Sequence, residues 1–169
     1  MIWGIPGRGK ATAAVEFALA FPVLLLFLGG VLDFGMINYY SSGVEHAATA
    51  GGQYALYSGN AVTGTNVAHV VQGAATLPTA ITATVTVPGN ATSPANAPAC
   101  GCVSGTTGNF TITGATCGAT CSIDNSTAIH YMYVTATANY TPMILQLPAL
   151  QSIIANTYQV SRTVRVSMP

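Results

Sequence analysis

The stretch ATAAVEFALAFPVLLLFLGGVL, residues 11–32, decides the fold, because it is a long and mostly apolar run. Glu16 is its only ionisable group. At about 1.5 Å of rise per residue, an α-helix over these residues is about 33 Å long, and the hydrocarbon core of a bilayer is about 30 Å thick. We therefore predict one membrane-spanning helix over residues 11–33. A cleaved signal peptide has an apolar core of only about 7–15 residues, closely followed by a small-x-small site. The nearest such site, Ala48-Thr49-Ala50, comes too late, so we expect the helix to be kept as an anchor.

The charges that flank this helix predict its orientation. Arg8 and Lys10 precede it, and Asp33 and Glu45 follow it. Because the cytoplasmic flanks of membrane helices are enriched in Lys and Arg, residues 1–10 are expected to form a cytoplasmic leader. Everything after Asp33 is then expected to lie outside.

The composition is typical of an exported protein and not of a cytoplasmic enzyme. The chain has 169 residues, of which 5% are charged, whereas an ordinary soluble domain has roughly 25%. Its length allows one domain plus an anchor. The basic residues form no stripe, so we expect no nucleic-acid partner; they are Arg8, Lys10, Arg162 and Arg165, at the two chain ends.

Helical periodicity continues beyond the membrane segment. Apolar residues recur at spacings of mostly three or four from Met36 to Ala48, which predicts an amphipathic stalk helix over residues 34–57. We expect Gly51 and Gly52 to soften this helix, and the sequence SGN at residues 58–60 to end it. A shorter helix is predicted over residues 66–77, with Thr65 or Asn66 as its N-cap.

From Ala80 onward the apolar period changes to two, which is typical of strands with one buried face. Strands are predicted over residues 81–87, 131–140 and 158–166, with a fourth, shorter candidate at 109–113. The Pro- and Gly-rich segment before that candidate is predicted to be a loop, and Thr141–Ala155 a packed connection or short helix because of its two prolines. The predicted fold class is α+β, with a long N-terminal transmembrane and stalk helix packed on a small antiparallel sheet, and residues 58–169 as the outer α+β domain.

Four cysteines lie in the part of the chain predicted to be outside, in the sequences CGC and CGATC. An oxidising compartment favours two disulfides. A bond between Cys100 and Cys102 would be strained, so we expect each of them to pair with Cys117 or Cys121 and to staple the Pro-rich loop to the sheet. A four-thiolate zinc site is the alternative, but CxC with CxxxC fits zinc-ribbon spacing poorly.

Other motifs do not predict catalysis. GIPGRGK at residues 4–10 fits the start of a phosphate-binding loop, but only three residues precede it and Ala11 follows Lys10 where a hydroxyl is needed. No nucleotide is therefore expected. His46, His69 and His130 are scattered along the sequence, and no nucleophile elbow is present. We expect no enzymatic activity, no cofactor and no metal.

Glu16 is the unusual residue of the apolar run. An acidic side chain at mid-membrane costs roughly 2.5–3.5 kcal/mol on insertion scales, and less near an edge. One interpretation is that Glu16 reaches toward the cytoplasmic headgroups, since it lies five residues from Ala11. The other is that it pairs with a cation of a neighbouring chain in an assembly.

The N-terminal segment resembles the TadE/TadG-like family of the tight-adherence, Flp-type pilus machinery. The resemblance covers residues 8–57 and depends on AAVEFAL, on Pro22 followed by leucines, on Asp33-Phe34-Gly35 and on the small-residue sequence AATAGGQYA. The cysteine pairs and the final strands resemble the outer part of some members less specifically. The resemblance implies a pilin-like fold and a pseudopilin-like minor component with its N-terminus in the cytoplasm.

The resemblance also implies roles for residues near the start of the helix. Some members are cut by a prepilin-type peptidase after a small residue, usually Gly, five positions before the glutamate, which corresponds here to a cut between Ala11 and Thr12. Ala11 stands where Gly is usual, and Phe17 where Tyr often follows. If the cut occurs, the new amine of Thr12 is the cation that pairs with Glu16 of a neighbouring subunit. If the cut does not occur, the protein is an uncut, membrane-anchored assembly factor.

The sequence thus predicts a structural or assembly component of a tight-adherence type IV pilus and secretion system in a bacterial inner membrane, with its outer domain periplasmic or extracellular. Its expected partners are the membrane, other pilus-assembly proteins and pilins, and the prepilin peptidase. Lateral helix packing is expected through the small-xxx-small pair Ala14 and Ala18. The alternative is a membrane-anchored adhesin or binding module with a Thr-rich face.

Overall fold

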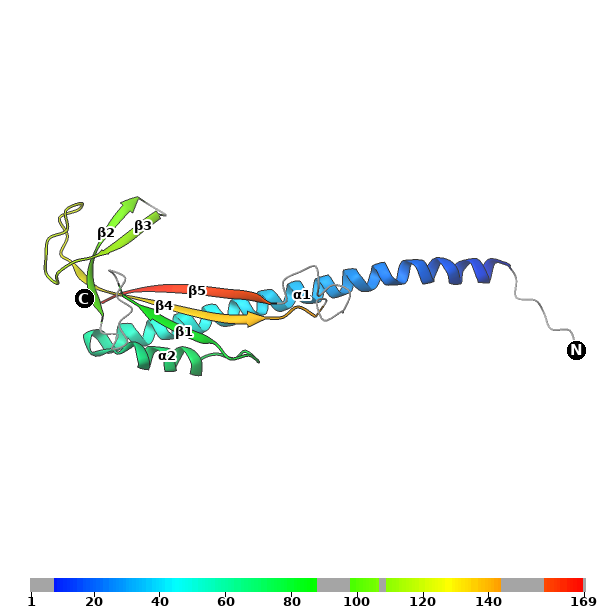
Figure 1. The fold of residues 1–169 in the computed structure, drawn as a ribbon, viewed down its shortest axis with the longest axis horizontal. Helices are drawn as coiled ribbons and strands as arrows, with labels where there is room; N and C mark the ends of the chain where they lie inside the picture. The colour runs from blue at the N-terminus through cyan, green and yellow to red at the C-terminus, as the bar shows by residue number, and fades with distance from the viewer. Residues whose placement is uncertain (1–7, 88–97, 107–108, 144–156, 169) are drawn as a thin grey trace, which may run out of the picture. The chain divides into compact units, whose positions relative to one another are not determined.

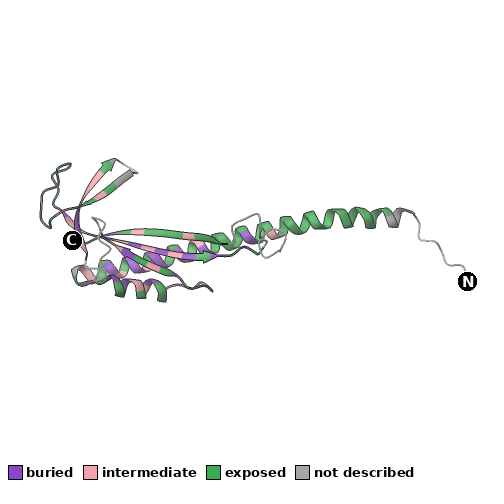
Figure 2. Ribbon diagram, in the orientation of Figure 1, coloured by how far each residue is buried: buried purple, intermediate pink, exposed green. Residues whose placement is uncertain are grey.

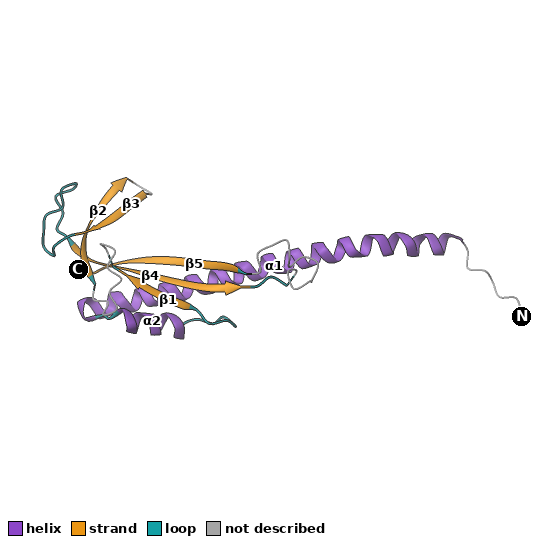
Figure 3. Ribbon diagram, in the orientation of Figure 1, coloured by secondary structure: helices purple, strands orange, loops and turns teal. Residues whose placement is uncertain are grey.

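The computed structural model describes residues 8–87, 98–106, 109–143 and 157–168. The chain is α+β, as predicted, with one long N-terminal helix and a five-stranded antiparallel sheet (Figures 1 and 3). The elements are α1 (Arg8–Ser58), a 3-10 turn (Gly59–Ala61), α2 (Gly64–Gly73), β1 (Thr82–Thr86), β2 (Ala99–Thr106), β3 (Asn109–Gly114), β4 (Ile129–Tyr140) and β5 (Tyr158–Met168). The chain divides into two units, Met1–Asn38 with Thr141–Tyr158, and Tyr39–Tyr140 with Gln159–Pro169.

Helix α1 runs for 51 residues without a break, and Pro22 lies inside it. In the first unit, nearly every side chain from Thr12 to Leu32 is exposed, although an 18-residue window of this helix has a mean hydropathy of 2.3 (Figure 2). A helix of this length and composition can cross a membrane. The helix ends at Ser58, where Gly59 takes a φ of +57°, a left-handed conformation that glycine adopts without steric cost. The predicted end of the helix at residues 58–60 is confirmed.

The core of the second unit lies between helices and sheet. From Tyr40 onward, α1 buries one face, and α2 lies beside it against the same face of the sheet (Figure 1). Small side chains bring the helix close to the strands, since Ala47, Ala48 and Ala55 are fully buried. At one end of this core, the rings of Tyr40 and Tyr140 pack with centroids 5.0 Å apart.

Gly51 and Gly52 are packing residues of α1 and not flexible points. A Cβ at Gly51 would collide with Val71 of α2 and lie 3.1 Å from Val134 of β4, and one at Gly52 would lie 3.0 Å from Val164 of β5. Helix α1 passes through both glycines unbroken. The two glycines therefore mark where the helix backbone comes closest to its neighbours, a role that differs from the expected softening.

Strand β4 is the centre of the sheet. The strand order is β1-β4-β2-β3, and β5 also pairs with β4. Along β4, the side chains alternate between the buried and half-buried classes from Met132 to Ala138, so one face of the strand packs on the helices and the other faces outward. On β5, which pairs with β4, the hydroxyl of Thr163 lies 2.9 Å from that of Thr135.

Two elements differ from the sequence expectations. Strand β2 occupies part of the segment predicted to be a loop, because pairing with β3 and β4 and two disulfides hold it extended despite its Gly and Ser residues. Helix α2 begins earlier than predicted: Thr63 is its N-cap, and its hydroxyl accepts a hydrogen bond from the backbone N–H of Asn66 at 3.4 Å. The predicted connection Thr141–Ala155 lies outside the described residues beyond Met143.

Candidate functional site

The residues predicted for processing and assembly lie in the first turns of α1. The backbone at Ala11 and Thr12 is helical, and Glu16 follows one turn later with an exposed side chain. Ala14 and Ala18 are four residues apart on the same helix, so they lie on one face, and both are exposed. The side chain of Ala11 is outside the described part of the chain. Glu16 is two residues from each of these alanines, about 200° around the helix, so its carboxylate lies on a different face from the alanine pair.

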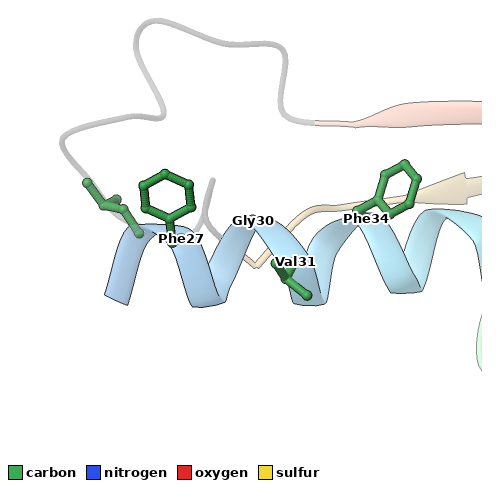
Figure 4. A pocket seen from close by; sticks show the side chains of 5 residues that line it. Phe27, Gly30, Val31 and Phe34 are labelled. Atoms are coloured by element: carbon green, nitrogen blue, oxygen red, sulfur yellow. The ribbon is translucent and has the colours of Figure 1, made fainter. Parts of the chain in front are cut away.

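Further along the same helix, an apolar groove of about 440 Å³ lies at Gly30 (Figure 4). The rings of Phe27 and Phe34 flank Gly30, where a Cβ would meet nothing within 4 Å. The lining is almost entirely carbon, as expected of a surface that faces lipid or another helix. The glycine itself could be recognised in the sequence, but the groove depends on the direction of the two rings.

Asp33 has a structural role that the sequence analysis did not predict. Its side chain is only 7% exposed, and its Oδ1 accepts a hydrogen bond of 2.8 Å from the backbone N–H of Met143. The carboxylate therefore ties the chain just after β4 to the end of the predicted membrane segment. In the sequence, the only signal is an acidic residue at an apolar boundary, which was used to orient the helix.

The four cysteines form two disulfides, Cys100–Cys117 and Cys102–Cys121, and the prediction of two disulfides is confirmed. Each bond runs from β2 to the loop that follows β3, and their Cα–Cα distances are 5.0 and 5.5 Å. Cys100, Cys121 and Ala128 form a small buried cluster separate from the main core. The disulfides thus supply much of the covalent and apolar contact that holds this loop on β2.

His130 lies against one of these disulfides. It is directly opposite Cys100 in the β2–β4 pairing, and its Nε2 is 3.5 Å from Sγ of Cys117. The two sulfurs and an imidazole nitrogen all lie within 4.8 Å of one another, a spacing that would allow three ligands to share a metal ion. In the oxidised chain both sulfurs belong to the disulfide, so a metal site there would require its reduction first.

The loop between the cysteine cluster and β4 contains a turn held by Asp124. Its Oδ1 accepts hydrogen bonds from the hydroxyl of Ser126 at 2.7 Å and from the Ser126 backbone N–H at 3.0 Å. These bonds, the hydroxyl first, lower the pKa of Asp124 below its ordinary value. Burial raises the pKa of Tyr131, and the negative charge of Asp124 raises it further.

The outward face of the sheet carries a regular set of hydroxyl groups. Thr84 of β1 pairs with Thr135 of β4, whose hydroxyl meets that of Thr163 on β5. The adjacent row also carries hydroxyl groups, and there the Thr137 hydroxyl donates a hydrogen bond of 3.3 Å to the hydroxyl of Ser161. At the end of this face, the guanidinium of Arg165 lies 5.8 Å from the centroid of the Tyr133 ring.

These features define a class of protein: an α+β domain, stapled by two disulfides, that continues directly from a single helix of membrane-spanning length. Residues 11–53 match the family model described as TadE-like protein, so this segment is TadE-like and the resemblance predicted from the sequence is confirmed. That match links the chain to the proteins of tight-adherence pilus assembly. It covers about a quarter of the chain and includes Glu16, Asp33 and Gly51. No curated protein and no solved structure matches the chain.

Proposed function

We propose that this protein is a minor, pseudopilin-like component of a tight-adherence pilus and secretion system, anchored in a bacterial inner membrane with its second unit on the outer side. The observation that carries the proposal is the position of the TadE-like match. Residues 11–53 include the exposed apolar part of α1 and also its buried face up to Gly52. The family segment therefore both anchors the chain and supports the sheet.

Lateral packing of α1 is the proposed mode of assembly. Ala14 and Ala18 allow the backbone of a second helix to approach closely, and the groove at Gly30 offers another place for such an approach. The partners are pilins and other pilus-assembly proteins. The second unit then presents its sheet to the components outside the membrane.

Deletion of the gene in the source bacterium tests this function. We expect surface pili counted by electron microscopy to disappear or fall sharply, and to return with the wild-type gene. A chain that keeps residues 39–169 behind an unrelated membrane helix serves as the control for α1, and should not restore the pili. Normal piliation in the deletion strain would contradict the proposal.

Processing by a prepilin peptidase is proposed to occur between Ala11 and Thr12. The new amine of Thr12 then pairs with Glu16 of a neighbouring subunit. This ion pair offsets the free-energy cost of removing the carboxylate from water. Intact mass of the protein purified from its membrane should correspond to a chain that begins at Thr12. Ala11→Gly, which restores the residue usual in the family, should increase the processed fraction, and a mass that still includes residues 8–11 in both proteins would refute the cut.

Glu16 is tested separately from the cut. Glu16→Gln keeps the size of the side chain and removes its charge, so we expect it to reduce piliation while the protein remains in the membrane. Gln53→Glu, a change at an exposed position of the same helix, is the matched control for altering one carboxylate. Unchanged piliation with Glu16→Gln would show that Glu16 only reaches toward water.

A second candidate function is that of a membrane-anchored adhesin, and the hydroxyl rows on the sheet favour it. Each hydroxyl can donate one hydrogen bond and accept two, which matches the hydroxyl groups of a glycan. Full-length protein in phospholipid nanodiscs, applied to an array of immobilised glycans, tests this candidate. Binding that is lost on Thr84→Val and Thr163→Val together would support an adhesin, and absence of binding would remove it.

A further inference from the structure

The two disulfides differ in how much of each is open to solvent. In both bonds one cysteine is buried, with Cys100 4% and Cys121 2% exposed. Their partners are unlike, because Cys117 is exposed and Cys102 is only half-buried. A nucleophile from solution therefore reaches the first bond at Cys117 more easily than it reaches either sulfur of the second.

The first bond also has an imidazole beside it. His130 Nε2 is 3.5 Å from Sγ of Cys117, an exposed residue, and the Cys100 sulfur is within 4.8 Å of a nitrogen of the same ring. The position of the ring is set by β4, because His130 is paired directly with Cys100 of β2. Within the described residues, no imidazole makes a comparable contact with Cys102 or Cys121.

We propose that Cys117 is a thiol–disulfide exchange site, at which a dithiol oxidoreductase of the cell envelope makes and breaks the Cys100–Cys117 bond. This inference goes beyond the proposed role in pilus assembly and does not depend on it. A thiolate of the oxidoreductase attacks Sγ of Cys117 and forms an intermolecular disulfide. The bond between Cys117 and Cys100 breaks, and its electron pair leaves on Sγ of Cys100.

His130 assists this step through charge and proton transfer. In its imidazolium form it stabilises the departing Cys100 thiolate and then supplies the proton that makes the thiol. The second thiol of the oxidoreductase next attacks the sulfur of the first oxidoreductase cysteine, which is bonded to Cys117 in the mixed disulfide. The oxidoreductase closes its own disulfide, and Cys117 is released as a thiol. Overall, the protein's disulfide is reduced to two thiols, the dithiol is oxidised to a disulfide, and the reverse sequence forms the bond during folding.

Partial reduction of the full-length protein in nanodiscs tests the order of opening. A limiting amount of dithiothreitol is added at neutral pH, samples are quenched with acid, and the freed thiols are alkylated and located by mass spectrometry. We expect Cys100 and Cys117 to be labelled well before Cys102 and Cys121. Simultaneous labelling, or earlier labelling of Cys102 and Cys121, would overturn the proposal without the need for any variant.

Replacement of His130 tests the role of the imidazole. His130→Gln keeps a polar side chain and should slow the opening of Cys100–Cys117 by about threefold to tenfold, since the leaving thiolate loses the imidazole beside it. The opening of Cys102–Cys121 should stay unchanged, which separates the effect from general loosening of the domain. His69→Gln, on the exposed face of α2, is the matched control. An unchanged rate in His130→Gln would overturn the role of His130.

Discussion

Gly51 shows how one residue without a side chain fixes the approach of a helix to a sheet. The positions that its Cβ would need are occupied by Val71 and Val134, both of them fully buried. Interiors of this density have little room to give way. Packing of the second unit therefore depends on the absence of a Cβ at Gly51. Secondary-structure propensity scales do not describe this requirement.

Gly51→Ala should destabilise the second unit by about 1–3 kcal/mol, since an added methyl group forces well-packed neighbours apart. Gly73→Ala is the control: it is at the end of α2, where a Cβ meets nothing within 4 Å, and should be neutral or stabilising by up to about 1 kcal/mol. Urea unfolding of the full chain, followed by circular dichroism, measures both. Equal midpoints for the two variants would contradict the close packing at Gly51.

Asp124 makes its turn sensitive to acid. Because its pKa is lowered in the folded chain, its contribution to stability is present above the pKa of the unfolded chain and is lost as pH falls through the lowered, folded value. Ser126→Ala removes the hydroxyl that is the largest cause of the shift, so the pKa should rise toward its ordinary value. Carboxyl resonances followed by NMR during an acid titration measure this change. Identical titration of Asp124 in both proteins would contradict the role of Ser126.

For single residues, the sequence predicted what kind of bond a side chain forms better than it predicted which residues that side chain contacts. Cys100 and Cys102 could each be assigned a partner among Cys117 and Cys121, because two cysteines separated by one residue bond poorly to each other, but the sequence left open which partner each takes. Asp33 could not be assigned to Met143, since the two are 110 residues apart and nothing in either local sequence indicates the contact. His130 was treated as scattered for the same reason, because only strand pairing brings it to Cys100.

At the scale of elements, the strands with clear alternation were predictable and β2 was not. β4 carries apolar residues at every second position from Met132 to Tyr140, and β5 does so from Val160 to Met168 except at Arg162, a pattern that local sequence reveals. β2 is composed largely of Gly, Ser and Cys, whose strand preference is low, and its conformation depends on partners distant in the sequence. The end of α1 was predictable because a local signal, Ser58 followed by glycine, controls it.

Reduction of both disulfides should loosen one group of elements and leave another intact. The cluster of Cys100, Cys121 and Ala128 is separate from the main core, which contains Val44, Val134 and Val166. Hydrogen exchange measured by mass spectrometry should therefore rise for residues 99–128 after full reduction and remain slow for β4 and for residues 44–55. Equal loss of protection in both regions would show that the two clusters fold as one.

At the scale of the whole molecule, the described residues of the two units have different surfaces. Residues 12–32 expose apolar side chains as a lipid phase requires, whereas the second unit has a buried core and an outward face of hydroxyl groups. One continuous helix belongs to both. The TadE-like match ends at residue 53, inside α1, so it covers no strand of the sheet.

Orientation in the membrane can be tested with the native cysteines. In spheroplasts treated with a membrane-impermeant reductant and an impermeant maleimide, we expect Cys117 to be labelled without permeabilisation, because the proposed orientation, based on the positive residues before α1, puts the second unit outside. A cytoplasmic thiol protein in the same sample serves as the control and should stay unlabelled. Labelling of Cys117 only after permeabilisation would reverse the proposed orientation.

The bond between Asp33 and Met143 has a consequence for the order of events during synthesis. Asp33 leaves the ribosome 110 residues before its partner, so the contact cannot form until all of β4 has been synthesised. This hydrogen bond therefore forms late, after α1 and β4 have both been synthesised. A chain stalled before Met143 would lack this hydrogen bond of Asp33, which would distinguish it from the completed protein.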